Sequence, residues 1–449
     1  MAGTLTREQV LWRWRIFICT YVGYAGYYLT RKVYSICKSS LHEQFDWDSQ
    51  QLAHIWTVYL IAYSVGQFVN SYYGRKWGPR AILLTGLAIS IGCNVVFGAA
   101  NSYQTFLVFM IINGLVQATG WPGVVGTISR WLRPGERGTI MGIWGTSYQL
   151  GTILVGFVGG FLLGHWGWRW SFWGCTMITL GIWWLIYAWQ RNKPEDAGLD
   201  PIVGEMESDT RAVRGSQAET ITFKEYLQIA LSPLVLIMGG SYFCIKFVRY
   251  GLDSWLPMFL NILGMTKEVS SYYSQVFTIA GLLGAVATGF VLDRYLKGRW
   301  ALLSFVMGIG MVAACWGVIY QGMSPVHIAL YSGLIGFMIY GPDTMLCGFA
   351  SVVLAGEKNT AAVAGVVNGI GSIGPVVAEE VIGWMNRKGV DPHVGIRNTN
   401  LLYMLMSAVF VCFMVVVMVT SRRTHAKNAA QDAELLAAET LDTGKGRRG

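Results

Sequence analysis

The sequence predicts an all-α polytopic membrane protein with twelve transmembrane helices in two six-helix pseudo-repeats. Three observations lead to this fold class: an apolar composition, hydrophobic runs long enough to cross a bilayer, and short patterns that occur once in each half. Of 449 residues, 53% are hydrophobic and only 13% are charged, whereas a soluble chain carries about a quarter charged residues. We therefore expect lipid to be the solvent around most of the chain.

The apolar runs define the expected helices. Each has about twenty residues, enough to cross a hydrocarbon core about 30 Å thick. They cover residues 14–38, 52–73, 81–100, 104–130, 139–164, 169–190, 234–260, 270–293, 300–321, 325–355, 361–385 and 400–420. The first run follows a polar stretch and has no small-residue cleavage site, so we expect a transmembrane helix there rather than a signal peptide.

The net charge of +9 is distributed over alternate loops rather than over one patch. The basic loops carry Arg75, Lys76, Arg80, Arg130, Arg133, Arg137, Arg294, Lys297 and Arg299. Basic residues also precede the first span and follow the last, where Arg422 and Arg423 lie. By the positive-inside rule, both termini are expected in the cytoplasm, although Arg387, Lys388 and Arg397 then fall on the outer side. This distribution does not indicate binding to nucleic acid.

The sequence offers no signs of catalysis. The 8 cysteines are scattered without a CxxC pair and the 6 histidines do not cluster, so neither a disulfide framework nor a metal site is expected. It also contains no nucleophile with a matching base and no phosphate-cradling glycine loop. We therefore expect neither an enzyme nor a cofactor.

The chain divides into four segments. Residues 1–190 form the first six-helix half, 191–231 a polar cytoplasmic linker, 232–421 the second half and 422–449 a polar cytoplasmic tail. The halves share patterns at a nearly constant offset, among them Arg31 with Arg249 and GWP at 120–122 with YGP at 340–342. Such offsets indicate internal duplication. Two parallel repeats place a substrate site between them, near the bilayer midplane.

Charged residues inside the predicted helices mark the candidate site, because a charge in the membrane interior is costly. Helical spacing puts Tyr24, Tyr28 and Arg31 on one face of the first helix, and Arg249 takes the equivalent place in the seventh. The planar guanidinium fork suits phosphate, and two arginines match its double charge. The competing interpretation is that Arg31 anchors the helix at the interface and Arg249 merely pairs with Asp253.

Further polar residues leave alternatives open. Lys246 either extends the phosphate site or neutralises Asp343 or Glu379. Asn368 and Ser372 follow helical spacing with Glu379, and they either meet sugar hydroxyls or pack in the polar interior.

The chain resembles the organophosphate:phosphate antiporter family of the major facilitator superfamily, through both halves. The matching stretches are GYAGYYLTRK at 23–32, GWP at 120–122, ERG at 136–138, RYG at 249–251 with Trp255 and Pro257, and GFMIYGP at 336–342. Gly289-x-x-x-Asp293-Arg294 resembles the gating motif of facilitators, and its first copy is degenerate, with Ser71 and Arg75.

The resemblance implies the major facilitator fold, with lobes that rock about the site. It also implies that Arg31 and Arg249 bind phosphate and that a set of aromatic residues lines the site. That set is Tyr24, Tyr28, Tyr63, Trp121 and Tyr340. A sugar-phosphate branch known from endoplasmic reticulum is similar at KSSLH (38–42), but short loops without a glycosylation sequon favour a bacterial inner membrane. The expected protein is a monomeric antiporter without cofactors.

Departures from glycerol-3-phosphate transporters bear on the substrate. Gln67 stands where those proteins have a lysine, Tyr148 where they have a histidine, and Lys246 and Ser372 where they have tyrosines. The comparison favours a hexose phosphate such as glucose 6-phosphate over glycerol 3-phosphate as the partner exchanged for inorganic phosphate. The rival function is a membrane receptor that senses an external sugar phosphate for a sensor kinase.

Overall fold

The computed structural model describes residues 5–128, 130–133, 136–200, 202, 228, 231–296, 298–322, 324–346 and 350–445. Within these ranges the regular structure is helical. Most of the predicted linker, residues 203–227, lies outside the described residues, as does Lys297 of the basic loops. The side chains of Ser71, Arg75, Pro122, Arg137, Arg422 and Arg423 also lie outside the described part.

The helices of the first half are α1 (Arg7–Phe45), α2 (Ser49–Trp77), α3 (Pro79–Ala99), α4 (Tyr103–Gln117), α5 (Gly120–Ile128), α6 (Arg137–Trp144), α7 (Ser147–Trp166) and α8 (Trp168–Trp189). A 3₁₀ turn, η2 (Pro194–Ala197), follows them. The helices of the second half are α11 (Pro233–Ile262), α12 (Lys267–Arg294), α13 (Trp300–Tyr320), α14 (Pro325–Thr344), α15 (Ala350–Met385) and α16 (Pro392–Lys445).

Local sequence signals set several helix starts. Thr6, Ser232, Thr266 and Ser324 each precede a helix, and each side chain accepts a hydrogen bond from the backbone N–H three residues later. Such caps satisfy N–H groups that have no partner within the helix. The starts of α1, α11, α12 and α14 are therefore encoded locally.

All twelve predicted spans contain helix, which confirms the predicted fold class. Nine helical stretches in the described part are long and apolar enough to cross a membrane. The other three of the twelve predicted spans correspond to α1, to α4 together with α5, and to α14. The fourth span is broken between Gln117 and Gly120, and the fifth between Trp144 and Ser147. The tenth ends at Thr344 instead of residue 355, because α15 has already begun at residue 350.

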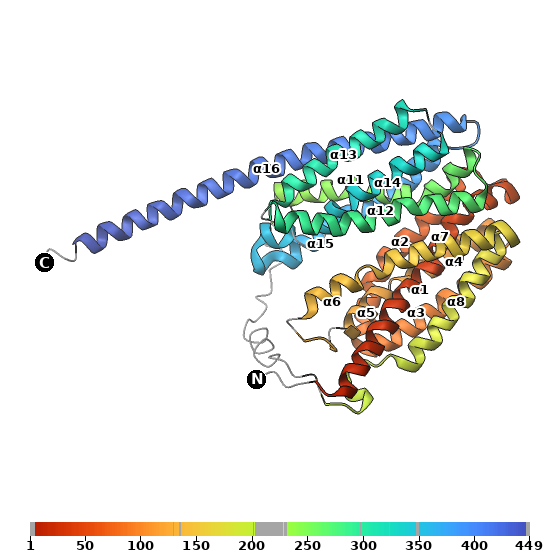
Figure 1. Ribbon diagram of the computed structural model, residues 1–449, viewed down its shortest axis with the longest axis horizontal. Helices are drawn as coiled ribbons and strands as arrows, with labels where there is room; N and C mark the ends of the chain where they lie inside the picture. Colours follow the sequence, from red (N-terminus) through yellow and green to blue (C-terminus); the bar gives the residue numbers. More distant parts are fainter. Residues whose placement is uncertain are drawn as a thin grey trace.

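The helices form two lobes, one from each half (Figure 1). Within the first lobe α1 packs against α7 and α8, and α2 packs against α4. Within the second, α12 packs against α14 and α11 against α15. The lobes meet chiefly through α7 with α12, α2 with α15 and α1 with α11, and α1 also contacts α12. This arrangement places the faces of α1 and α11 that carry the two arginines along the central interface.

The lobes converge at the end of the molecule that is far from the two termini (Figure 1). There α15 lies so close to α2 that a Cβ added to Gly383 would lie 2.5 Å from the Ala53 Cβ. Lys267 of α12 reaches Glu43 of α1 at 2.6 Å. We refer to this region as the closed end. Because a larger side chain at position 383 would clash with α2, glycine there permits the close approach of α15 and α2.

An exposed ion pair also spans the lobes at the closed end. The Lys388 ammonium lies 2.7 Å from the Asp46 carboxylate. The hydrogen bond from Lys388 lowers the pKa of Asp46, and the same contact raises the pKa of Lys388. Because both side chains are exposed, the pair orients the loops more than it stabilises the fold.

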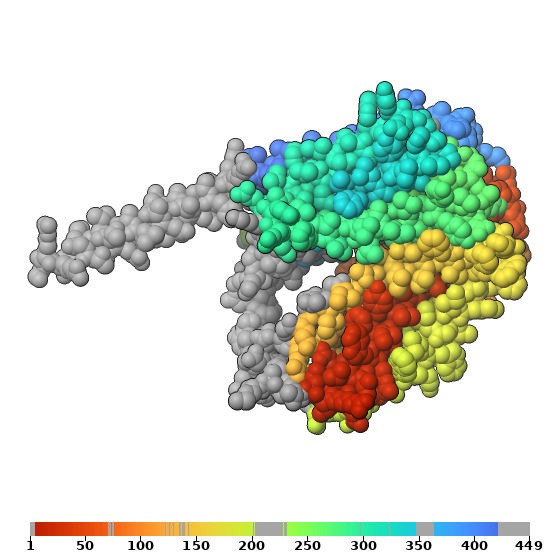
Figure 2. Space-filling model, in the orientation of Figure 1, coloured from red at the N-terminus to blue at the C-terminus, as the bar shows by residue number. Residues whose placement is uncertain are grey.

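The opposite end, which carries both termini, is open. Figure 2 shows the surface hollowed between the two lobes at this end. The side chains that join the lobes through α1, for example Lys38 with Glu379, lie toward the closed end. A molecule located between the lobes would therefore be reached from the end with the termini.

Candidate functional site

Two arginines lie at the centre of the interface, one from each lobe. Arg31 of α1 is buried, with 8% of its surface exposed. Arg249 of α11 has a side chain that is 14% exposed. Guanidinium groups in a membrane interior require compensation from protein or ligand, so the partners of each arginine define the chemistry of the site.

Arg31 is enclosed by tyrosine rings. Its guanidinium carbon lies 4.5 Å from the ring centre of Tyr63, 4.8 Å from Tyr28 and 5.7 Å from Tyr59. No carboxylate among the described residues lies within 4.0 Å of Arg31, and its buried Nε has no hydrogen-bond partner in that part of the chain. Ring faces attract the cation but do not cancel its charge. The electrostatics therefore favour an anion beside Arg31.

Tyr59 was not among the residues that the sequence indicated. It is almost fully buried, and its ring stacks on Tyr63 at 6.1 Å. The available signal was its spacing of four residues before Tyr63 on α2, which places both rings on one face.

Arg249 has both an acidic partner and aromatic neighbours. It is paired with Asp343 of α14 at 2.5 Å, and its guanidinium carbon lies 4.4 Å from the ring centre of Tyr340. The ring of Tyr148, which belongs to α7 of the other lobe, lies 5.4 Å away. The alternative in which Arg249 pairs with Asp253 is not what the structure shows. Asp253 instead forms an ion pair with Lys32 across the two lobes.

Lys246 lies one helical turn from Arg249 on α11. Its ammonium donates to Asn368 Oδ1 at 2.8 Å and to Ser372 Oγ at 3.2 Å, both on α15. The structure therefore brings Lys246 together with Asn368 and Ser372, which the sequence had related to each other and to Glu379 by helical spacing but not to Lys246.

The acidic partners suggested for Lys246 belong to other cations. Asp343 accepts from Arg249, and Glu379 accepts from Lys38 at 3.1 Å. Each of these carboxylates is thus in contact with a cation other than Lys246, and both interpretations of Lys246 stay predictions. Spacing along one helix could not identify these pairs, because each partner comes from a different helix.

Aromatic residues cover the side of Arg31 that faces the open end. The ring of Tyr24 lies 5.8 Å from Trp121 and 5.1 Å from Trp144, and the ring of Tyr28 lies 5.7 Å from Tyr148. Trp121 is 44% exposed. Trp144, which the sequence did not indicate, is fully buried behind it. The rings form a wall on which an organic moiety could pack.

The predicted gating motif lies apart from the arginines. Gly289, Asp293 and Arg294 are exposed in the last turns of α12, which ends at Arg294. This position is at the end of the molecule where the lobes separate. The motif therefore does not contribute side chains to the arginine site.

Among the described residues, the largely buried charged groups between the lobes have an excess of positive charge. The cations are Arg31, Lys32, Lys38, Lys246 and Arg249, and the carboxylates are Asp253, Asp343 and Glu379. With every group ionised, these described residues sum to a charge of +2. A phosphate dianion carries the complementary charge, and the guanidinium fork matches its oxygens.

Comparisons with known proteins agree with this architecture. The profile of the Major Facilitator Superfamily matches residues 20–379. Among solved structures, a bacterial homolog of the human lysosomal transporter Spinster in an inward-facing conformation superposes with a TM-score of 0.70, at 15% identity, covering 90% of this chain and 96% of that one. A D-xylose-proton symporter gives a TM-score of 0.68 at 16% identity, covering 89% and 97%. At these identities the likeness concerns the fold alone.

Sequence relatives are more informative. A glycerol-3-phosphate transporter of Bacillus subtilis is 32% identical over 377 residues, covering 81% of this chain and 83% of the relative. A probable hexose phosphate transport protein of Chlamydia pneumoniae is 26% identical over 369 residues, covering 78% and 80%. The membrane sensor protein UhpC of Escherichia coli is 26% identical over 390 residues, covering 85% and 86%.

Fold and site together define the class, which is a multi-pass membrane transporter of the major facilitator type. Within that class, the chain belongs to the organophosphate:phosphate antiporter family of the major facilitator superfamily.

Proposed function

We propose that the protein exchanges an organic phosphate for inorganic phosphate across a bacterial inner membrane. The observation that supports this most directly is the buried Arg31, which has no carboxylate partner among the described residues and lies at the lobe interface with Arg249. A phosphate group that bridges the two guanidinium groups would join the lobes. Both termini are then cytoplasmic, as the basic loops indicate, so the open end faces the cytoplasm.

Binding would redistribute the hydrogen bonds of Arg249. In the structure this arginine is held by Asp343, whose second oxygen Oδ1 is buried without a partner in the described part. Phosphate would compete with Asp343 for the same donors, while Arg31 offers donors that no carboxylate in the described part of the chain uses. Substrate therefore enters beside Arg31 and weakens the Arg249–Asp343 pair. That change links binding to movement of α14 relative to α11.

The favoured organic substrate is a hexose phosphate such as glucose 6-phosphate. Lys246, Asn368 and Ser372 form a polar group of amide, hydroxyl and ammonium one turn from Arg249. Such groups recognise hydroxyls by directional hydrogen bonds. Glycerol 3-phosphate is the second candidate, because the relative from Bacillus subtilis that shares 32% identity is a glycerol-3-phosphate transporter.

Counterflow in proteoliposomes tests the proposed function. Vesicles loaded with unlabelled phosphate should accumulate labelled phosphate, and external glucose 6-phosphate or glycerol 3-phosphate should compete with that uptake. Binding of a sugar phosphate without any exchange would instead support a receptor, a function that the relative named as a membrane sensor brings into consideration. Absence of both binding and exchange would contradict the proposal.

The contacts of Lys246 lead to a prediction about its mutants. We expect Lys246→Ala to raise the KM for glucose 6-phosphate about tenfold, since hydrogen bonds to charged groups contribute roughly 1.5–3 kcal/mol. Neither Asp343→Asn nor Glu379→Gln should rescue the variant, because these carboxylates pair with Arg249 and Lys38. The measurement is concentration-dependent exchange in proteoliposomes. Rescue by either second substitution would show that Lys246 acts by neutralising that carboxylate.

The buried pair Lys38–Glu379 predicts how the closed end is held. Both side chains are almost fully buried, at 0% and 1% exposed, and Lys38 also donates to Ser254 at 2.7 Å. Glu379→Gln leaves an uncompensated ammonium between the lobes, which is strongly unfavourable. We expect this variant to favour separation of the closed end. An impermeant thiol reagent should then label Ala53→Cys at least tenfold faster than in the parent.

Two controls make that labelling experiment specific. Glu380→Gln removes the neighbouring carboxylate, which contacts Gln50 and is partly exposed, and should leave the labelling rate near that of the parent. Lys38→Met combined with Glu379→Met removes both charges and should restore slow labelling, because an apolar pair can replace a buried ion pair. Equal labelling in all variants would exclude a role of this pair in closure.

A further inference from the structure

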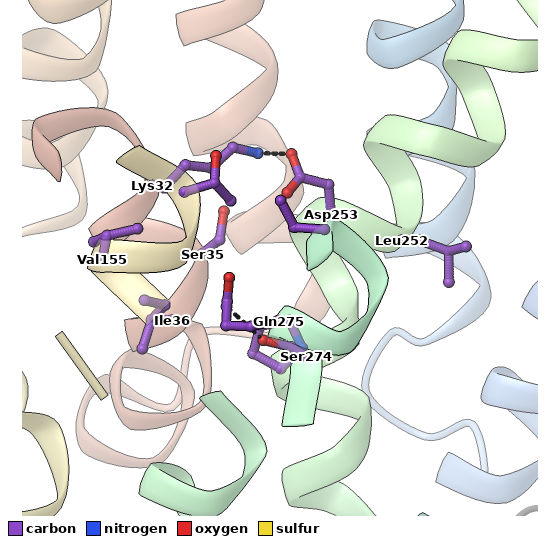
Figure 3. Close-up of a pocket in the computed structure, with 11 residues that line it drawn as sticks. Lys32, Ser35, Ile36, Val155, Leu252, Asp253, Ser274 and Gln275 are labelled. Carbon is purple, nitrogen blue, oxygen red and sulfur yellow. Dashed lines mark hydrogen bonds and ion pairs between the residues drawn. The ribbon is translucent and has the colours of Figure 1, made fainter. Parts of the chain in front are cut away.

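A small cavity lies between the lobes on the closed-end side of the two arginines. It is bounded by α1, α7, α11 and α12, so both lobes contribute to its wall. Figure 3 shows Lys32 and Ser35 of α1, Val155 of α7, Asp253 of α11 and Gln275 of α12 around the same space, with the Lys32–Asp253 contact at its edge. None of the comparisons assigns a role to this cavity.

Two polar atoms in the cavity wall have no hydrogen-bond partner in the described part of the chain. They are Ser35 Oγ and Gln275 Oε1, and their residues are only 3% and 5% exposed. A serine within a helix ordinarily donates back to the carbonyl one turn earlier, and Ser35 does not. The Gln275 amide nitrogen donates to Ser271 O at 3.1 Å and to Ser274 Oγ at 3.0 Å, which leaves its oxygen unused.

The position of Gln275 is fixed by close packing of the lobes. A Cβ added to Gly156 of α7 would lie 2.0 Å from the Gln275 side chain. Ser271, one turn earlier on α12, donates to the Gly156 carbonyl at 2.7 Å. The backbone of α7 at Gly156 therefore holds Gln275 in place. An amide that is positioned in this way and still has a buried, unused oxygen points to a partner that the protein itself does not supply.

The unused groups match one kind of ligand. Gln275 Oε1 accepts a hydrogen bond, and the Ser35 hydroxyl can donate one. A hydroxyl group needs that combination, since it donates one hydrogen bond and accepts others. The cavity has a volume of about 20 Å³. A cavity volume of about 10–15 Å³ is enough to hold one water molecule. In this conformation the cavity therefore accommodates a single hydroxyl or water.

The cavity is placed where such a hydroxyl would occur in an organic phosphate. Ser35 follows Arg31 by four residues on α1, and Asp253 follows Arg249 by four residues on α11. One helical turn advances about 5.4 Å along the axis. A phosphate between the arginines would thus lie about one turn from the cavity, which is the scale of the separation between a phosphate and the first hydroxyls of a phosphorylated polyol.

We propose that this cavity is the hydroxyl subsite of the carrier. It binds one hydroxyl of the phosphorylated substrate through Ser35 and Gln275, and it holds a water when inorganic phosphate is transported. This inference rests on the proposed exchange function and names the substrate class, which is a phosphate ester with a hydroxyl near the ester carbon. Ser35 and Gln275 are then residues that determine specificity against alkyl phosphates.

The test compares inhibition of phosphate:phosphate exchange by glucose 6-phosphate, glycerol 3-phosphate and propyl phosphate, which has no free hydroxyl on its chain. The measured quantity is the half-inhibitory concentration of propyl phosphate divided by that of each hydroxylated ester. We expect Ser35→Ala and Gln275→Met each to lower this selectivity ratio about three- to tenfold, the range for one neutral hydrogen bond.

Thr152→Val is the matched control. Thr152 lines the same cavity, but its hydroxyl already donates to the Tyr148 carbonyl at 2.9 Å, so this variant should retain the parental ratio. An unchanged ratio in Ser35→Ala overturns the hydroxyl subsite even if Gln275→Met fails to fold. A different result would overturn the proposed function. In that case neither glucose 6-phosphate nor glycerol 3-phosphate would inhibit phosphate:phosphate exchange by the parent protein.

Discussion

Efflux of labelled phosphate from proteoliposomes should be about a thousandfold slower into phosphate-free buffer than into buffer with phosphate or glucose 6-phosphate. In the empty carrier, the largely buried charged groups between the lobes sum to +2 among the described residues. Occlusion removes the water that screens this charge, and an uncompensated buried charge costs several kcal/mol. A bound phosphate dianion cancels the excess. A difference of about 4 kcal/mol in barrier corresponds to roughly a thousandfold in rate.

The efflux experiment separates obligatory exchange from uniport. Protein-free vesicles give the rate of passive leak, which is subtracted from both conditions. Glu380→Gln is a suitable control variant, since it removes a carboxylate outside the arginine site, and it should show the same dependence on external substrate. Comparable efflux with and without external substrate would contradict the exchange mechanism.

Arg31→Lys and Arg249→Lys should each reduce exchange ten- to hundredfold while leaving expression unchanged. Lysine keeps the positive charge but cannot donate two parallel hydrogen bonds to phosphate. Each lost hydrogen bond to a charged group is worth about 1.5–3 kcal/mol. The effect of Arg249→Lys should also include a weaker contact with Asp343. The measurement is initial rate of phosphate:phosphate exchange in proteoliposomes with equal amounts of protein.

Arg15→Lys provides the matched control for these substitutions. Arg15 lies on α1 as Arg31 does, but it is exposed near the start of the helix and contacts the ring of Trp12. The same chemical change there should leave exchange near the parental rate. Near-parental exchange by either Arg31→Lys or Arg249→Lys would refute a site in which both guanidinium groups hold the phosphate.

Local patterns in the sequence were sufficient for most of the fold. Hydropathy over about twenty residues located all twelve spans, since a helix in lipid must satisfy its backbone internally and expose apolar side chains. The paired positions of Arg31 and Arg249 also followed from the sequence, because internal duplication preserves the offset between equivalent residues. The breaks at Gln117 and Trp144 were missed, since hydropathy averaged over a window does not respond to an interruption of one or two residues.

The amino-acid sequence by itself determined which residues are charged, which helices carry them and which two arginines are equivalent. The tertiary structure alone decided their partners. Lys32 pairs with Asp253 and Lys38 with Glu379 across the lobes, whereas Asp343 pairs with Arg249 between two helices of one lobe. Helical periodicity relates residues within three or four positions of each other. An ion pair between different helices depends on how those helices pack, so it is defined only by the tertiary structure, within one lobe for Arg249–Asp343 and between the lobes for the two lysine pairs.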